Sequence, residues 1–241
     1  MTKENLEEFT RRFQTSRNNI MREYGQHMFL SYLYQEKKGE RLLFKGGTAL
    51  RIVMKSPRFS EDLDFTGVGI TQREIETLFA DTLARLEKVG FRVALNTAKE
   101  TTGGYLGNAT LDVFGWQAVV HIEVSLRNGK KMNGVQSVIE NDYIPSYTLV
   151  HLDEREIIQG KLEALFNRHK PRDFYDYFFL LSLREPPPAT RQRETLTRVL
   201  SLLRDVDIDF RSELKQFLPA SHAMIMRDFK GILERKIRQY L

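Results

Sequence analysis

Residues 42–65 read LLFKGGTALRIVMKSPRFSEDLDF, and this stretch decides the fold class. An apolar run ends at Lys45 and is followed by two glycines and a threonine, a pattern typical of a strand, a tight turn and a helix start, with Thr48 as a candidate N-cap. Such a turn lets the backbone approach a phosphate, because no Cβ stands in the way. Alone, a Gly-Gly pair is more often a plain turn.

Two acidic residues end the stretch, and they alternate with apolar ones. On a strand, Asp62 and Asp64 would project from one face, while Leu63 and Phe65 enter the core. Two adjacent like charges are unfavourable unless divalent cations lie between them, and a pair of cations is a common means of phosphoryl or nucleotidyl transfer. The alternative is a solvated acidic strand end. The nearby glycine turn favours a functional site.

The two motifs together resemble the nucleotidyltransferase superfamily that includes DNA polymerase β, in which a Gly-Gly or Gly-Ser turn is followed by Asp-x-Asp. The resemblance is closer to the AbiEii/AbiGii toxin family, on residues 44–50 (FKGGTAL) and 58–65 (RFSEDLDF). It covers most of the chain, because a second block similar to the family lies at residues 161–176.

This resemblance implies a nucleotidyltransferase that uses Mg²⁺ or Mn²⁺, consumes a nucleoside triphosphate and releases pyrophosphate. It further implies the toxin of a type IV toxin-antitoxin or abortive-infection system, with a cognate antitoxin and an RNA acceptor such as the 3′ end of tRNA. One alternative is a nucleotidyltransferase that modifies a protein or small-molecule hydroxyl. Another is a nucleotide-binding or RNA-binding module without turnover, which the presence of both aspartates disfavours.

The expected metal ligands are Asp62, Asp64 and Glu123. Residues 118–126 predict a strand with His121, Glu123 and Ser125 on one face. In the superfamily that the chain resembles, a further acid on a neighbouring strand completes the metal site and activates the attacking hydroxyl as a general base. Asp112 is the rival third carboxylate, because the sequence does not say which strand lies beside Asp62.

The expected nucleotide-binding residues are Lys45, Gly46, Gly47, Thr48, Arg58, Ser60 and Lys161. Lys161 lies among the apolar positions of a predicted helix, where a lysine reaches either the rim or a cleft. The family resemblance favours a cleft, with Lys161 on the nucleotide phosphates and residues 172–176 as an Arg-Asp-x-x-Asp block.

Roles for individual residues of this set follow. Asp173 is expected to hold Lys161 or orient the substrate, because an unpaired lysine in a cleft is unfavourable. Asp176 is explained equally well as an acid in the first turn of a helix. Arg58 would neutralise charge as pyrophosphate leaves. Ser60 is either a nucleotide contact or a local cap.

Composition sets wider bounds. The 241 residues are 41% hydrophobic and 29% charged, as in an ordinary globular protein, and 37 basic against 32 acidic residues permit a polyanionic partner without requiring one. There is no cysteine, which excludes disulfides and thiolate metal sites and suits a cytoplasmic protein. No apolar run reaches the roughly twenty residues of a membrane helix, so no membrane partner is expected.

The sequence therefore predicts an α/β (α+β) fold, with a small mixed sheet that carries the glycine turn and the carboxylates. Residues 1–150 would form the nucleotidyltransferase core with helices at the N-terminus, and residues 151–241 a helical domain that closes the active-site cleft. Residues 71–89 predict a helix with a Thr71/Glu74 capping box. The other predicted strands cover residues 91–95, 109–114 and 147–150.

Overall fold

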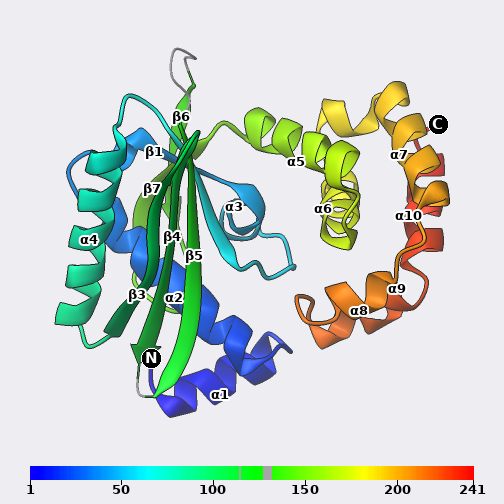
Figure 1. Cartoon of the computed structure of the whole chain (residues 1–241). Helices are drawn as coiled ribbons and strands as arrows, with labels where there is room; N and C mark the ends of the chain where they lie inside the picture. Colours follow the sequence, from blue (N-terminus) through cyan, green and yellow to red (C-terminus); the bar gives the residue numbers. More distant parts are fainter. Residues whose placement is uncertain (114, 127–131) are drawn as a thin grey trace. The chain divides into compact units, whose positions relative to one another are not determined.

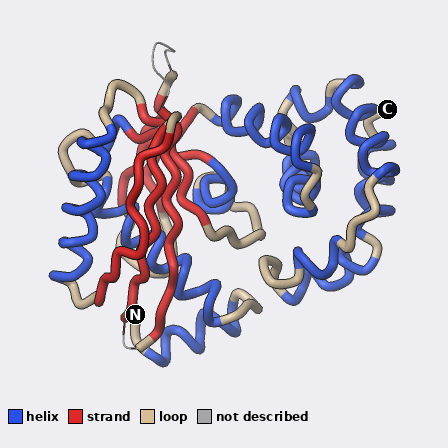
Figure 2. Tube along the Cα trace, viewed as in Figure 1, coloured by secondary structure: helices blue, strands red, loops and turns tan. Residues whose placement is uncertain are grey.

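The protein is built on a mixed seven-stranded sheet with helices around it (Figures 1 and 2). These features come from a computed structural model, which describes residues 1–113, 115–126 and 132–241. The predicted α/β fold class is confirmed. Phe114, the end of one predicted strand, lies outside the described residues.

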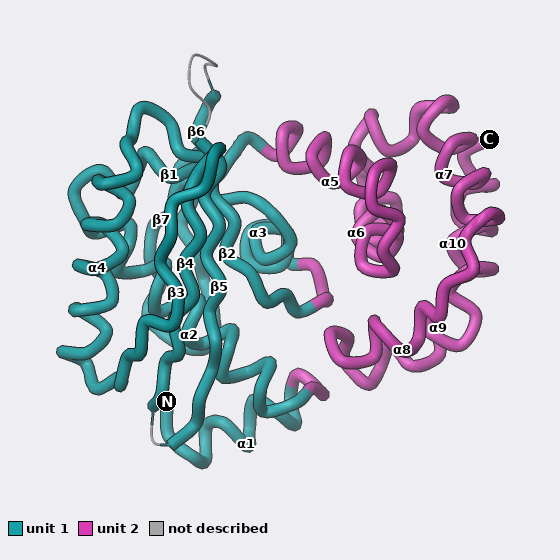
Figure 3. Tube along the Cα trace, viewed as in Figure 1, with its two compact units in different colours: residues 1–12, 16–55, 59–153 teal, residues 13–15, 56–58, 154–241 magenta. Residues whose placement is uncertain are grey.

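Two compact units divide the chain (Figure 3). Unit 1 comprises residues 1–12, 16–55 and 59–153, and unit 2 comprises residues 13–15, 56–58 and 154–241. Unit 1 contains α1 (Lys3–Arg12), α2 (Arg17–Leu33), η1 (Gly39–Arg41), β1 (Leu42–Lys45), α3 (Gly46–Ile52), β2 (Asp62–Gly67), α4 (Gln72–Lys88), β3 (Arg92–Thr101), β4 (Gly104–Val113), β5 (Trp116–Leu126), β6 (Gly134–Ile139) and β7 (Tyr147–Leu152).

Unit 2 is helical. It contains α5 (Glu154–Arg168), α6 (Pro171–Ser182), η2 (Pro188–Arg191), α7 (Arg193–Asp205), α8 (Phe210–Leu214), η3 (Ala220–His222), α9 (Ala223–Arg227) and α10 (Phe229–Arg238). Its core includes an aromatic cluster, in which the ring centroids of Phe210 and Phe229 are 5.0 Å apart and those of Tyr175 and Phe229 are 5.9 Å apart. The predicted role of this helical part, to close a cleft, stays a prediction.

The strand order of the sheet is β3-β4-β5-β2-β1-β7-β6. Two of the pairings are parallel, β2 with β5 and β1 with β7, and the others are antiparallel. The parallel pairings join segments that are far apart in sequence, so the centre of the sheet is assembled from both ends of unit 1.

One face of the sheet is covered by α2 and α4. Phe79 of α4 contacts Phe65 of β2, and Gly25 of α2 faces Leu111 and Val120 of the sheet. The predicted capping box of α4 is confirmed, since the Thr71 side chain accepts from the Glu74 backbone and the Glu74 side chain accepts from the Thr71 backbone. In Figure 1, α3 lies on the other side of the sheet from α4.

The strands β3 and β4 are longer than the sequence predicts, and β6 is an additional strand. Gly103 and Gly104 indicate a loop by composition, yet β4 begins at Gly104. A Cβ on Gly104 would overlap the backbone carbonyl of Val124 on the neighbouring strand. This glycine therefore permits a close approach between two strands rather than a turn, which local composition does not distinguish.

Within the described residues, no helix combines the length and the apolar character that crossing a bilayer requires.

Candidate active site

The two aspartates of the Asp-x-Asp motif lie on β2, beside a glutamate on β5. The two strands pair in parallel, with Asp62 opposite His121 and Asp64 opposite Glu123. Residues directly opposite each other on paired strands point to the same face, and their strands are about 4.8 Å apart. All three carboxylates therefore project from the face of the sheet opposite α2 and α4.

This register decides which acid lies next to the motif. Asp112 is on β4, which is separated from β2 by β5. Its carboxylate accepts hydrogen bonds from the Gly115 backbone at 3.0 Å and from the Gln117 side chain at 3.4 Å. Asp112 thus stabilises a turn, and Glu123 is the acid adjacent to Asp64.

The glycine turn lies directly against Asp64. Gly46 has a φ of 85°, a region that favours glycine, and a Cβ at this position would overlap the Asp64 carboxylate. Lys45 is opposite Asp64 in the antiparallel pairing of β1 with β2, and its ammonium donates to the Ser125 hydroxyl at 3.3 Å. Lys45, Asp64 and Glu123 therefore form one row across three strands.

The predicted N-cap role of Thr48 is wrong, because α3 begins at Gly46 with Lys45 as its N-cap. The chain turns at Gly46 and enters the helix at once, so Thr48 lies inside the first turn. Its side chain is buried, and its hydroxyl donates to the backbone carbonyl of Asp62. The Thr48 hydroxyl thus joins α3 to the start of β2, and its predicted nucleotide contact stays a prediction.

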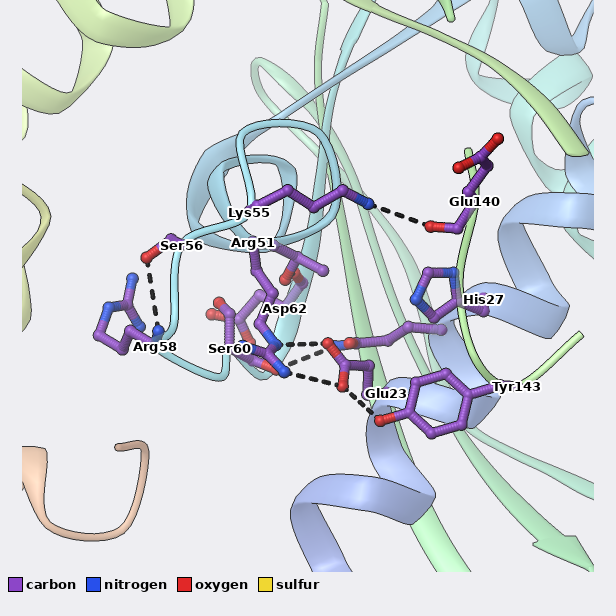
Figure 4. Close-up of polar contacts among 12 residues, drawn as sticks. Glu23, His27, Arg51, Lys55, Ser56, Arg58, Ser60, Asp62, Glu140 and Tyr143 are labelled. Atoms are coloured by element: carbon purple, nitrogen blue, oxygen red, sulfur yellow. Dashed lines mark hydrogen bonds and ion pairs between the residues drawn. The ribbon is translucent and has the colours of Figure 1, made fainter. Parts of the chain in front are cut away.

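Two polar residues of α2 hold the segments that lead to the aspartates. The side-chain amide of Gln26 donates to the carbonyls of Ser60 and Glu61, at 3.0 and 3.1 Å. Glu23 is buried, pairs with Arg51 of α3 and accepts from the Tyr143 hydroxyl at 2.6 Å (Figure 4). These contacts position α3 and the approach to β2.

The network of α2 was not found from the sequence. Its signal is the pair of polar residues Glu23 and Gln26, which are three apart and so lie on one face of the helix, among apolar and aromatic residues. Burial raises the pKa of Tyr143, and the charge of Glu23 raises it further, so the Tyr143 hydroxyl stays protonated and donates a hydrogen bond to Glu23.

The carboxylates of Asp62, Asp64 and Glu123 are the candidate metal ligands. Within residues 1–113, 115–126 and 132–241, no three histidine, aspartate or glutamate side chains are gathered so that they could hold a metal ion. Asp62, Asp64 and Glu123 are nonetheless neighbours on one face, and carboxylate oxygens are the donors that Mg²⁺ and Mn²⁺ prefer. The kind of donor therefore suits such an ion, and its binding at these residues stays a prediction.

Unit 2 contains a cluster of two cations around one buried carboxylate. The Lys161 ammonium lies 2.9 Å from one oxygen of Asp176. The Arg58 guanidinium binds the same carboxylate through both oxygens, at 2.7 and 2.9 Å. The exposed fractions of the side chains are 4% for Arg58, 1% for Asp176 and 11% for Lys161. Lys161 is therefore the member of the cluster with most access to solvent.

The charges of this cluster reinforce each other. Burial by itself would raise the pKa of Asp176, but attraction by Arg58 and Lys161 outweighs it and lowers that pKa. Burial opposes the charge of Arg58 as well, and Asp176 reverses this, so the pKa of Arg58 is raised. Asp176 and Arg58 therefore remain ionised at neutral pH.

The expectation that Asp173 holds Lys161 is wrong. Asp173 instead pairs with Arg168 at 2.6 Å and accepts from the Lys170 backbone at 3.3 Å. It lies in the first turn of α6, which begins at Pro171, so it caps the helix, and its negative charge interacts favourably with the helix dipole. One turn further along the helix, Asp176 points to Lys161, and this reverses the roles that the sequence suggested.

The sequence contained a signal for Asp176. It is the one acid in the apolar run from Phe174 to Leu181, and a charged group inside such a run is buried only with a partner of opposite charge. Arg58, expected on the phosphates, is itself buried and supports Asp176. Ser60 is half-buried in unit 1, and its predicted nucleotide contact stays a prediction.

Two solved structures share this fold. The structure of JHP933 from Helicobacter pylori matches with a TM-score of 0.64 and 20% identity, over 94% of this chain and 93% of that one. A structure described as a "putative nucleotidyltransferase" from H. pylori matches with a TM-score of 0.58 and 20% identity, over 94% of this chain and 99% of that one. No protein with a curated description matches the chain.

The sequence model of a known family matches residues 29–238, under the description "Nucleotidyl transferase AbiEii toxin, Type IV TA system". This match confirms the resemblance of residues 44–50 and 58–65. Because it covers most of unit 1 and nearly all of unit 2, this chain belongs to the AbiEii family of nucleotidyl transferase toxins of type IV toxin-antitoxin systems.

Proposed function

We propose that this chain transfers a nucleotidyl group from a nucleoside triphosphate to an RNA, with the 3′ end of a tRNA as the acceptor. The observation that carries the proposal is the register of β1, β2 and β5, which sets Lys45, Asp64 and Glu123 side by side against the glycine turn. Membership of the AbiEii family supports nucleotidyl transfer as the reaction.

The carboxylates of Asp62, Asp64 and Glu123 would hold Mg²⁺ or Mn²⁺. When bound, such a cation supplies positive charge to the triphosphate and to the attacking oxygen. The like charges of Asp62 and Asp64, two residues apart on one face, are explained by this role, because without a cation they repel each other.

The chain's own residues have the following roles in the transfer. An acceptor hydroxyl attacks the α-phosphorus, so a phosphodiester bond forms, the bond between the α- and β-phosphates breaks, and pyrophosphate leaves. Glu123 takes the hydroxyl proton as general base. Gly46 and Gly47 admit the triphosphate to the turn, with Lys45 as a nearby cation. Lys161 neutralises charge on the leaving pyrophosphate.

The charge balance of the chain supports RNA as the acceptor, and the family supports an antitoxin as the partner. The chain has 37 basic and 32 acidic residues, and this net positive charge is compatible with binding of RNA. A type IV toxin family also implies a nucleotide substrate and a cognate antitoxin.

The test is incubation of the purified protein with total RNA, Mg²⁺ and each nucleoside triphosphate in turn, labelled on the α-phosphate. We expect label in RNA, and in tRNA after size separation, and none with the Asp62→Asn, Asp64→Asn double variant or with a chelator. Glu123→Gln should lower the rate by about a hundredfold or more, as loss of a general base does.

Asp112→Asn is the matched control, because it changes an acid on the same sheet that lies one strand further away. Its rate should remain within a few-fold of wild type. Label in a protein or small molecule would refute RNA as the acceptor, but nucleotidyl transfer as the reaction would stand. No label in any species would overturn the transfer itself.

A further inference from the structure

A pocket of about 360 Å³ lies in unit 1 beside Asp62, over strands β3, β4 and β5. The polar residues that line it are Glu61, Asp62, Thr97, Lys99, Asn108, His121 and Glu123. Its volume is within the range of about 300–1,000 Å³ typical of small-molecule sites.

The register explains how the sheet builds this pocket. Thr97, Asn108, His121 and Asp62 are opposite one another on four consecutive strands. With strands about 4.8 Å apart, Asn108 is two strands, or about 10 Å, from Asp62. A ligand in this pocket would therefore lie within one nucleotide's reach of the carboxylates.

Asn108 is the residue that indicates a ligand. Its side-chain oxygen is buried and has no hydrogen-bond partner among the described residues. A buried acceptor without a partner is unfavourable, and such groups are rare in folded proteins. A ligand that donates a hydrogen bond at this point would satisfy it.

The rest of the pocket suits a flat, partly apolar ligand with polar edges. Leu106 lies on the same face of β4 as Asn108 and gives the pocket an apolar side chain, whereas Gly107 and Ile122 line it from positions whose side chains would point to the other face. Lys99 is exposed and opposite Leu106 in the pairing of β3 with β4, and it supplies a positive charge on the side away from Asp62.

We propose that this pocket binds a nucleobase with an exocyclic amino group, as in adenine or cytosine, whose amino group donates to Asn108. The base packs on the Leu106 side chain, and Lys99 attracts a phosphate. This proposal rests on the proposed function, because it assumes that the carboxylates beside the pocket catalyse nucleotidyl transfer. The base belongs either to the terminal nucleotide of the acceptor or to the incoming triphosphate.

The first test is a binding measurement that requires no transfer. Titration calorimetry of the full chain measures the affinity for four nucleoside monophosphates. Adenosine monophosphate is compared with inosine monophosphate, and cytidine monophosphate with uridine monophosphate, since only the first member of each pair has the exocyclic amino group. We expect about tenfold tighter binding of the amino form, the effect of one hydrogen bond to a buried group. Asn108→Leu should bring each pair to equal affinity.

Three further variants accompany this measurement: Lys99→Gln tests the phosphate contact, and Thr110→Val and Arg92→Gln are controls. Thr110→Val alters the next residue on the same face of β4, outside the residues that line the pocket, and should leave the tenfold preference intact. Lys99→Gln should weaken all four monophosphates about equally, whereas Arg92→Gln, the same charge change on the same strand, should not. Equal affinity within the pairs for wild type, or a preference that survives in Asn108→Leu, would overturn the proposal.

The second test identifies the source of the base. KM is measured for RNA acceptors that end in adenosine or inosine, and separately for ATP and ITP, with wild type and Asn108→Leu. If the acceptor supplies the base, only the acceptor KM values converge in the variant; if the triphosphate does, only the ATP and ITP values converge. Amino-selective binding without any transfer would support the pocket and refute the proposed function. Transfer without amino-selective binding would do the opposite.

Discussion

The Lys161 ammonium lies 2.9 Å from an oxygen of Asp176, whose carboxylate is also held through both oxygens by the buried Arg58. One acid thus compensates two cations, and it does so almost fully out of water. This arrangement separates the structural role of Arg58 from the role that we assign to Lys161.

Asp176→Asn should destabilise the protein strongly, because it leaves Arg58 buried without its counter-charge. We expect a loss of about 3–5 kcal/mol in the free energy of unfolding, measured by urea denaturation. Asp173→Asn is the control on the same helix. Its partner Arg168 has 47% of its side chain exposed, so the arginine is not left buried without a counter-charge, and the expected loss is about 1 kcal/mol, that of a helix cap. Equal losses for the two variants would contradict the assignment.

Lys161→Met should fold normally and lose transfer. Asp176 keeps both of its hydrogen bonds to Arg58 in this variant, so the free energy of unfolding should change by only about 1 kcal/mol. Loss of a cation on the leaving pyrophosphate should lower kcat by about a hundredfold or more. Lys170→Met, which removes an exposed lysine of unit 2, serves as the control and should be fully active. A fully active Lys161→Met would remove this lysine from the reaction.

Gly46→Ala should lower transfer because its methyl group overlaps the Asp64 carboxylate. Gly69→Ala provides a matched control, since Gly69 also has a positive φ, of 60°, and a Cβ there meets nothing within 4 Å. Both substitutions should reduce stability by about 1 kcal/mol through backbone strain. Only Gly46→Ala should reduce kcat/KM, by more than tenfold. A similar kcat/KM for the two variants would show that the turn does not bear on Asp64.

The buried His27 should make stability depend on pH. Burial lowers its pKa from 6.5 to about 4, with opposition from Glu23. Between these pH values the unfolded chain binds a proton that the folded chain does not, so stability falls as pH drops from about 6.5 to about 4. The loss is on the order of 3 kcal/mol at the acidic end.

The measurement is the free energy of unfolding at several pH values from 4.5 to 7, for wild type and His27→Gln. The variant should show a shallower decline than wild type. If His27→Gln declines as steeply as wild type, other groups cause the acid sensitivity.

Local signals in the sequence were sufficient for several elements. The capping box of Thr71 and Glu74 marks the start of α4, because both of its hydrogen bonds are made within four residues. Alternation at Asp62 to Phe65 places both carboxylates on one face of a strand, since side chains alternate along any strand. Pro171 likewise marks the start of α6.

Pairings between distant segments required the tertiary structure. Whether Glu123 or Asp112 stands beside Asp64 depends on which strand pairs with β2, and a parallel pairing across some sixty residues leaves no local trace. The choice between Asp173 and Asp176 depends on the direction in which α6 packs on α5.

The sequence by itself therefore determined the kinds of residue at the site and the family that they indicate, because motifs and periodicity are properties of short segments. Only the tertiary structure decided which side chains meet. Strand pairing and helix packing bring together residues such as Asp64 and Glu123, or Lys161 and Asp176, through contacts that no single segment contains.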